Sequence, residues 1–142
     1  MSGPNIVVDT NVLIAALRFD RGSSNELLMQ AGENRFKICL SVALMLEYED
    51  VCKRQASQLS LTFEDIDDIL DYVYSVSELT TVHFRWRSSL PDPGDDMILE
   101  LAVASQSSSI VTFNARDFTG TQAFGITACS PREFLDSQKL LT

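Results

Sequence analysis

Residues 6–17 decide the fold of this chain: Ile-Val-Val-Asp-Thr-Asn-Val-Leu-Ile-Ala-Ala-Leu. The first three residues are apolar and β-branched, which is typical of a short buried strand. Asp9 follows at once, and the apolar run after it predicts a helix. Open α/β sheets bind ligands at the carboxyl ends of their strands, and Asp9 lies at such an end. Asp also favours the N-cap of a helix, so a functional role and a capping role are both open.

Strand and helix patterns alternate along the rest of the chain. This alternation predicts an α/β fold, in which helices cover both faces of a central, mostly parallel sheet of four to five strands. No linker or internal repeat is visible, so we expect a single domain over residues 1–142. The expected strands are 5–8, 35–40, 79–82, 109–113 and 125–128, and the expected helices are 10–17, 41–54, 62–77 and 94–106. Capping-box patterns at Ser23 and Ser130 predict two further helices.

The net charge of −9, from 20 acidic and 11 basic residues, bears on the class of ligand. A protein that grips nucleic acid by charge alone is usually basic, so a nucleic-acid function here needs bound cations or a local basic patch. Part of the acidity fits a solvated helix surface instead, because five acids surround an apolar stripe in the expected helix 62–77. These five are Glu64, Asp65, Asp67, Asp68 and Asp71.

Three cysteines at wide spacing, Cys39, Cys52 and Cys129, fit reduced thiols better than a disulfide framework or a zinc site. The one histidine, His83, falls in no ligand pattern, which argues against a zinc hydrolase. No apolar run approaches the ~20 residues that span a bilayer, and no signal-peptide pattern opens the chain. We therefore expect a cytoplasmic protein that is not embedded in a membrane.

Glu47 interrupts an apolar stripe in the expected helix 41–54. Leu44, Glu47, Tyr48 and Val51 share one helical face, at i, i+3, i+4 and i+7. A buried carboxylate without a partner is costly, so Glu47 should meet a cation or a cavity. A small rotation of the helix would instead place Glu47 at the edge of the stripe, in contact with water. Both readings remain open.

Further polar groups stand near the ends of expected strands. Asp95 and Asp96 open the helix that precedes the fourth strand, where acids also favour the helix dipole. Asn114 and Asp117, both ordinary turn formers, follow that strand. A parallel sheet can gather such groups and Asp9 in one crevice, where carboxylates raise one another's pKa unless a cation neutralises them. Hard oxygen ligands predict one or two Mg²⁺ or Mn²⁺ ions.

In this order, the motifs resemble a PIN domain, and in particular the VapC-type toxin nucleases. Residues 7–12 resemble the opening strand and first acid of that family, and residues 41–51 the helix that carries the second acid. Residues 92–102 resemble the helix of the third acid, and residues 110–118 the closing strand and loop. The resemblance covers nearly the whole chain and implies the three-layer α/β/α PIN-like fold.

The resemblance also implies an activity, that of a Mg²⁺- or Mn²⁺-dependent endoribonuclease. Asp9, Glu47 and Asp95 are the implied metal ligands, with Asp96 one residue along as the alternative to Asp95. At the fourth catalytic position many members carry an acid, where this chain has Asn114. Asp117 is the expected substitute ligand, and whether the site holds one ion or two stays open.

Substrate binding is expected at two places. Thr10, Asn11 and Thr112 adjoin the acids and are expected to contact RNA there. The segment His-Phe-Arg-Trp-Arg at residues 83–87 mixes cations with aromatic rings, a composition that suits phosphates and unpaired bases. An outward-facing arginine pair at the end of a strand is the alternative for Arg85 and Arg87.

The resemblance implies partners as well. PIN nucleases commonly form homodimers, and toxin members are held inactive by a small antitoxin, so this chain is expected to be the toxin of such a pair. One alternative is a catalytically weak or inactive PIN-like domain that binds RNA or protein. Another is an aspartyl phosphotransferase with Asp9 as nucleophile, although such enzymes usually carry a second Asp where this chain has Asn11.

Replacing both Arg85 and Arg87 by alanine should weaken RNA binding without changing metal affinity, because the two side chains would contact phosphates and not the ion. RNA affinity can be measured by fluorescence anisotropy and metal affinity by calorimetry. Unchanged RNA affinity would rule out this role for the segment.

Overall fold

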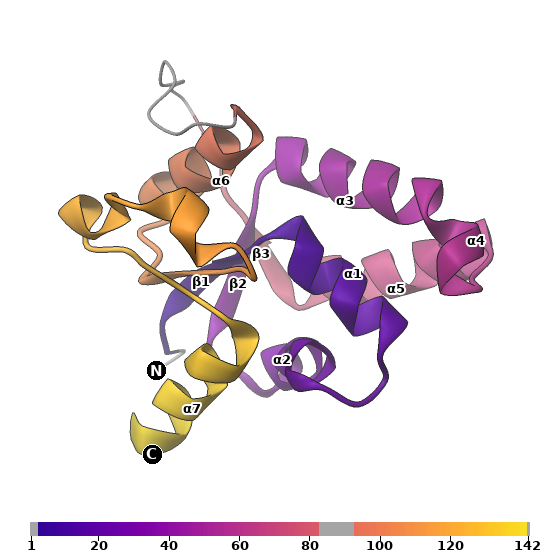
Figure 1. Ribbon diagram of the computed structural model, residues 1–142, viewed down its shortest axis with the longest axis horizontal. Coiled ribbons are helices and arrows are strands. Elements are labelled where there is room, and N and C mark those ends of the chain that lie inside the picture. The colour runs from indigo at the N-terminus through magenta and orange to yellow at the C-terminus, as the bar shows by residue number, and fades with distance from the viewer. Residues whose placement is uncertain (1–2, 83–92, 142) are drawn as a thin grey trace.

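Five parallel strands form the centre of the structure, a computed structural model that describes residues 3–82 and 93–141 (Figure 1). The strands are β1 (Asn5–Val8), β2 (Lys37–Leu40), β3 (Ser77–Leu79), β4 (Ser109–Val111) and β5 (Thr127–Cys129). Their order in the sheet is β3-β2-β1-β4-β5, and every neighbouring pair is parallel. The predicted sheet of four to five mostly parallel strands is confirmed.

The central strand β1 is the most deeply enclosed. Ile6, Val7 and Val8 expose 1% of their surface or less. β1 pairs with β2 on one side and with β4 on the other, so that Val8 lies beside Val111. Helices cover both faces of such a strand, which is why its sequence is continuously apolar and not alternating.

The helices flank this sheet on both faces. Their bounds are α1 (Thr10–Arg18), α2 (Ser23–Gln30), α3 (Val42–Arg54), α4 (Ala56–Leu59), α5 (Phe63–Ser75), α6 (Pro93–Ala104) and α7 (Pro131–Leu141). Three short 3₁₀ helices join them: η1 (Ala31–Glu33), η2 (Ala115–Phe118) and η3 (Thr121–Phe124). α6 packs on β1, β2 and β4, and α2 packs on α1 and α7. Figure 1 shows α6 on one side of the sheet and α2 with α7 on the other, which confirms the three-layer fold. Along the described part of the chain, every helix is too short or too polar to cross a membrane.

Side-chain caps mark two of the helix starts. Ser41 precedes α3, and its hydroxyl oxygen accepts a hydrogen bond from the backbone N–H of Leu44 at 3.1 Å. Ser130 and Glu133 form the predicted capping box at the start of α7: the Ser130 N–H donates to the Glu133 carboxylate at 2.9 Å, and the Glu133 N–H donates to the Ser130 hydroxyl oxygen at 3.1 Å.

Two local predictions are wrong. The capping box predicted at Ser23 is absent, because Ser23 is already the first helical residue and the N-cap is Gly22, which has no side chain. The third strand is Ser77–Leu79 and not residues 79–82. It lies at the edge of the sheet, where Ser77 and Glu78 need no apolar partner. The apolar pattern therefore placed the strand too far toward the C-terminus.

The acidic helix α5 is a solvated surface, as predicted. Its five acids are all exposed, while Ile66, Leu70 and Val73 are buried on the opposite side. Asp67 forms an ion pair with Lys53 of α3 at 2.9 Å. This part of the negative charge therefore lies on an exposed helix surface.

The buried residue Tyr48 fixes α3 to the end of β1. Its side chain is 1% exposed, and its hydroxyl donates a hydrogen bond to the carbonyl oxygen of Val8. A second tyrosine holds α3 from another side: the Tyr74 hydroxyl of α5 donates to the carbonyl oxygen of Met45 on α3 at 3.1 Å. The helix that carries Glu47 is thus held against the strand that precedes Asp9.

Replacing Tyr48 by phenylalanine should lower the free energy of unfolding by about 1–3 kcal/mol, because the Val8 carbonyl oxygen loses its hydroxyl donor inside the protein. Urea denaturation measures this free energy. Tyr74→Phe is the matched control, and its effect should be smaller because the Tyr74 hydroxyl bond is only partly buried. A Tyr48→Phe protein as stable as the parent would contradict the role given to this bond.

Candidate functional site

Asp9 lies where the strand order of the sheet reverses. From β1 the chain proceeds to β2 and β3 on one side, and then returns to place β4 and β5 on the other. Ligands of open α/β sheets bind outside the carboxyl ends of the strands at such a point. Asp9 follows β1 and Thr112 follows β4, and the Thr112 hydroxyl donates a hydrogen bond to Asp9 Oδ2 at 2.8 Å.

Three neighbours orient the Asp9 carboxylate. Oδ1 accepts from the backbone N–H of Thr10 at 2.8 Å, and Oδ2 accepts from Asn11 Nδ2 at 3.4 Å as well as from Thr112. The Asn11 side chain also accepts from the N–H of Phe113 at 3.3 Å, and so bridges the ends of β1 and β4. Asp9 is the N-cap of α1. The capping role is therefore confirmed, and Asp9 also lines the pocket, while its functional role stays a prediction.

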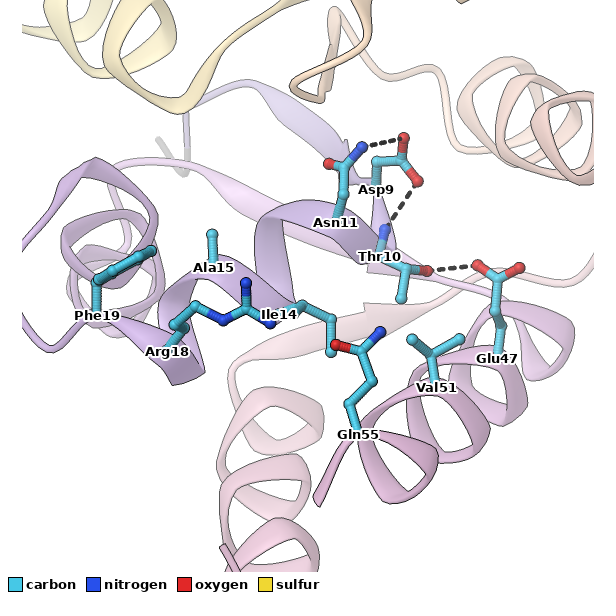
Figure 2. Close-up of a pocket in the computed structure, with 10 residues that line it drawn as sticks. All are labelled: Asp9, Thr10, Asn11, Ile14, Ala15, Arg18, Phe19, Glu47, Val51 and Gln55. Carbon is cyan, nitrogen blue, oxygen red and sulfur yellow. Dashed lines mark hydrogen bonds between the residues drawn. The ribbon is translucent and has the colours of Figure 1, made fainter. Parts of the chain in front are cut away.

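Glu47 lines the same pocket as Asp9. The Thr10 hydroxyl donates a hydrogen bond to Glu47 Oε2, and Glu47 is half-buried. Figure 2 shows Asp9, Thr10 and Glu47 together at one end of the pocket, which has a volume of about 490 Å³. Its lining residues are Asp9, Thr10, Asn11, Ile14, Ala15, Arg18, Phe19, Glu47, Val51 and Gln55.

The electrostatic environment of Asp9 disfavours its negative charge. Burial raises the pKa of Asp9, and the negative charges of Glu47 and Asp117 raise it further, against the opposing effect of the hydrogen bonds from Thr112 and Thr10. Asp117 of η2 is thus near enough to influence Asp9. Asn114, the residue at the fourth catalytic position, is exposed, and its backbone N–H donates to the Thr112 hydroxyl oxygen at 3.0 Å.

The third acidic position lies in the first turn of α6. Asp96 is 5% exposed, whereas its neighbour Asp95 is only half-buried. Glu100, one turn further on, is 9% exposed, and sequence reasoning gave it no role. The signal that could have found it is an acid within the otherwise apolar run from Met97 to Val103. Of the predicted substrate contacts, Arg85 and Arg87 lie outside the described residues, as does His83.

The donors at this site fit a hydrated divalent ion better than an all-protein cage. Asp9 and Glu47 place two carboxylates on one pocket. In residues 3–82 and 93–141, however, no group of three His, Cys, Asp or Glu side chains could hold a metal ion. Mg²⁺ commonly keeps several waters and binds through one or two carboxylates, a requirement that these two residues meet.

The opposite end of the pocket was missed by sequence reasoning. Arg18, Phe19 and Gln55 line it, together with Ile14 and Ala15. A basic residue in the last turn of a helix is an ordinary partner of the helix dipole, so Arg18 gave no distinctive signal. Gln55 follows α3, and only the packing of α1 on α3 brings it near Arg18.

A family model described as the PIN domain matches residues 5–116, from β1 into η2. The chain belongs to the PIN domain family. Members of this family are generally nucleases. The matched region includes Asp9, Glu47, both candidate acids of α6 and Asn114, and it ends one residue before Asp117.

A solved structure shares the fold. It is the crystal structure of VapBC2 from Rickettsia felis bound to a DNA fragment from their promoter. One of its chains is 16% identical to this PIN domain, with a TM-score of 0.60 over 87% of this chain and 98% of that chain. At this identity the likeness concerns the fold. No curated protein matches the chain.

Replacing Asp9 by asparagine should not destabilise the metal-free PIN domain at neutral pH, and should raise its unfolding temperature. Because the folded-state pKa of Asp9 lies above the unfolded value, the ionised group opposes folding at higher pH. This cost falls away as the pH drops through the raised pKa toward the ordinary value. Asparagine can still accept from the Thr10 N–H, and asparagine also serves as an N-cap.

The measurement is thermal unfolding in EDTA from pH 4 to 8, then with Mg²⁺. The advantage of Asp9→Asn should shrink toward acid pH, and Mg²⁺ should stabilise the parent but not the variant. A variant that unfolds at a lower temperature than the metal-free parent at pH 8 would refute this electrostatic account.

Proposed function

We propose that this PIN domain is a divalent-metal-dependent endoribonuclease. One observation carries the proposal: Asp9 and Glu47 face the same pocket at the strand-order reversal, and Thr10 links them, because its backbone N–H donates to Asp9 and its hydroxyl donates to Glu47. Membership of a family that consists largely of nucleases supports hydrolysis of a phosphodiester as the reaction. RNA as the substrate and Mg²⁺ or Mn²⁺ as the cofactor are the finer parts of the proposal.

In this proposal, Asp9 and Glu47 hold the ion, and Asp117 adds negative charge beside Asp9. When bound, Mg²⁺ or Mn²⁺ would supply Lewis-acid activation of water and would stabilise charge on the phosphate. Thr112 and Asn11 keep the Asp9 carboxylate in one orientation. Thr10 does the same for Glu47. Such fixed neighbours matter because a ligand set works only when its geometry is organised before binding.

We further propose that Asp96 is the better candidate than Asp95 for the third acid. Counting along the sequence favoured Asp95, but Asp96 is the more buried of the two in the first turn of α6. A buried carboxylate is held in fewer rotamers than a half-buried one, and is therefore the better organised ligand. Asn114 can contribute only a neutral amide at the fourth catalytic position. Because this position then adds no charge to bind a second ion, we propose a site with one ion.

The biological role that we propose is the toxin of a toxin–antitoxin pair, acting in the cytoplasm as a homodimer. The sequence resemblance to VapC-type nucleases supports this role. The fold shared with a chain of the VapBC2 structure is compatible with it. A small antitoxin protein is then the partner that holds the toxin inactive.

Two observations favour a second candidate, a PIN-like domain that binds RNA or protein without cleaving it. Asn114 replaces an acid and is exposed, and no three-member acidic cluster is present in the described ranges. Such a domain would bind RNA and leave it intact under every metal condition.

Purified protein should cleave a mixed-sequence single-stranded RNA in the presence of Mn²⁺ or Mg²⁺, and EDTA should abolish the cleavage. Asp9→Asn and Glu47→Gln should each lower the rate by more than about a hundredfold, since even neighbours of metal ligands commonly contribute ten- to a hundredfold. Cleavage that persists in EDTA or in both variants would overturn the metallonuclease proposal.

Asp95→Asn and Asp96→Asn form a matched pair, because each removes one charge from the same helical turn. We expect Asp96→Asn to lose cleavage as Glu47→Gln does, and Asp95→Asn to retain most of it. Each rate should be measured at saturating Mn²⁺ alongside thermal unfolding of the variant. The opposite ranking would assign the third acid to Asp95.

A further inference from the structure

The pocket that begins at Asp9 and Glu47 does not end there. It continues between α1 and α3 to a second end formed by Arg18, Phe19 and Gln55. Figure 2 shows the two acids at one end and Arg18 with Phe19 at the other, with the Arg18 guanidinium extended along the pocket toward Gln55. The apolar side chains of Ile14, Ala15 and Val51 line the pocket as well.

The Arg18 guanidinium carries a positive charge at this end of the pocket. Among the residues that the structure describes, no carboxylate lies within ion-pair distance of it, although the chain carries 20 acids. Its place in the last turn of α1 favours the helix dipole, but that effect does not require the guanidinium to lie in the pocket. A guanidinium offers paired N–H donors that match a phosphate group.

Phe19 adds an aromatic surface to the lining of the same pocket. Its side chain is 58% exposed, which leaves the ring available to a ligand. The Gln55 side chain adds an amide, which can both donate and accept hydrogen bonds. A cation, an exposed ring and an amide form the combination that contacts phosphate, base face and base edge in single-stranded nucleic acids.

The two ends of the pocket are separated along α1. Asp9 precedes α1 and Arg18 ends it, so their backbones are nine residues apart, or roughly 13 Å at the helical rise of 1.5 Å per residue. This separation leaves room for phosphates of two different nucleotides of one strand.

We infer that Arg18, Phe19 and Gln55 form a nucleotide subsite for single-stranded RNA, in which Arg18 binds a phosphate neighbouring the scissile one and Phe19 stacks on its base. The inference rests on the proposed ribonuclease function and specifies how an acidic protein holds a polyanion. Charge complementarity carries it, because this end of the pocket presents a cation that forms no ion pair within residues 3–82 and 93–141, where the other end presents two carboxylates.

The first test is the binding of a fluorescein-labelled, mixed-sequence single-stranded RNA, measured by anisotropy in EDTA. Arg18→Ala should weaken binding roughly ten- to a hundredfold, the range for one lost hydrogen-bonded contact to a charged group. The slope of log affinity against log salt should also fall by about 0.7, as expected for one phosphate contact on a single strand.

Matched controls separate the subsite from a general charge effect. Arg21→Ala removes the same charge three residues away, at a different pocket, and should leave RNA affinity nearly unchanged. Phe19→Ala should weaken binding roughly five- to a hundredfold, and Phe19→Trp should restore it. Phe63→Ala is the control, because Phe63 is equally exposed, at 57%, but lies on α5.

The outcomes distinguish this inference from the proposed function. RNA that binds in an Arg18-dependent way but is not cleaved would support the subsite and overturn the nuclease. Cleavage that is unaffected by Arg18→Ala, or equally affected by Arg21→Ala, would overturn the subsite and leave the nuclease standing. If the parent binds no RNA but binds poly-glutamate through Arg18, this end of the pocket is a peptide site and the inference is wrong.

Discussion

The pairing of β1 with β4 is the constraint on which the rest of the site depends. It joins the two halves of the chain at the point where the strand order reverses, and the backbone N–H of Asp9 extends it with a 2.9 Å hydrogen bond to the Val111 carbonyl oxygen. Thr112 consequently reaches Asp9 across 103 positions of sequence. If this register slipped by one residue, the side chains after β4 would point to the other face of the sheet and Asp9 would lose its hydroxyl donor.

The fold and the placement of Asp9 and Glu47 on one pocket could be predicted from sequence because their signals are local. β-branched runs marked the buried strands, and a carboxylate directly after the first strand must lie at the carboxyl edge of a parallel sheet. Glu47 was found because it interrupts an apolar helical stripe. The third strand was misplaced because an edge strand needs little apolar surface. The capping box at Ser23 failed because the helix begins one residue earlier than its pattern implied.

Other parts of the site were beyond sequence reasoning because they depend on tertiary geometry. Asp95 and Asp96 differ by one position, which turns a side chain by roughly 100° around a helix of 3.6 residues per turn, so only packing distinguishes the buried acid from its neighbour. Arg18 and Gln55 come from the ends of two different helices and meet only because α1 packs on α3. The spacing of residues along the chain does not predict this proximity of Arg18 and Gln55.

Asp9 caps α1 and is also a proposed metal ligand, and this combination affects how the family can lose its activity over evolutionary time. Because the Asp9 side chain also caps α1, a lineage that no longer cleaves nucleic acid would still gain stability from a capping amide at this position. Glu47 starts no helix, and among the described residues its carboxylate accepts a side-chain hydrogen bond from the Thr10 hydroxyl alone. In relatives that have lost the activity, therefore, the residue equivalent to Glu47 should be substituted before the one equivalent to Asp9. The Glu47 position is the more informative of the two for distinguishing an active enzyme from a relative that keeps only the fold.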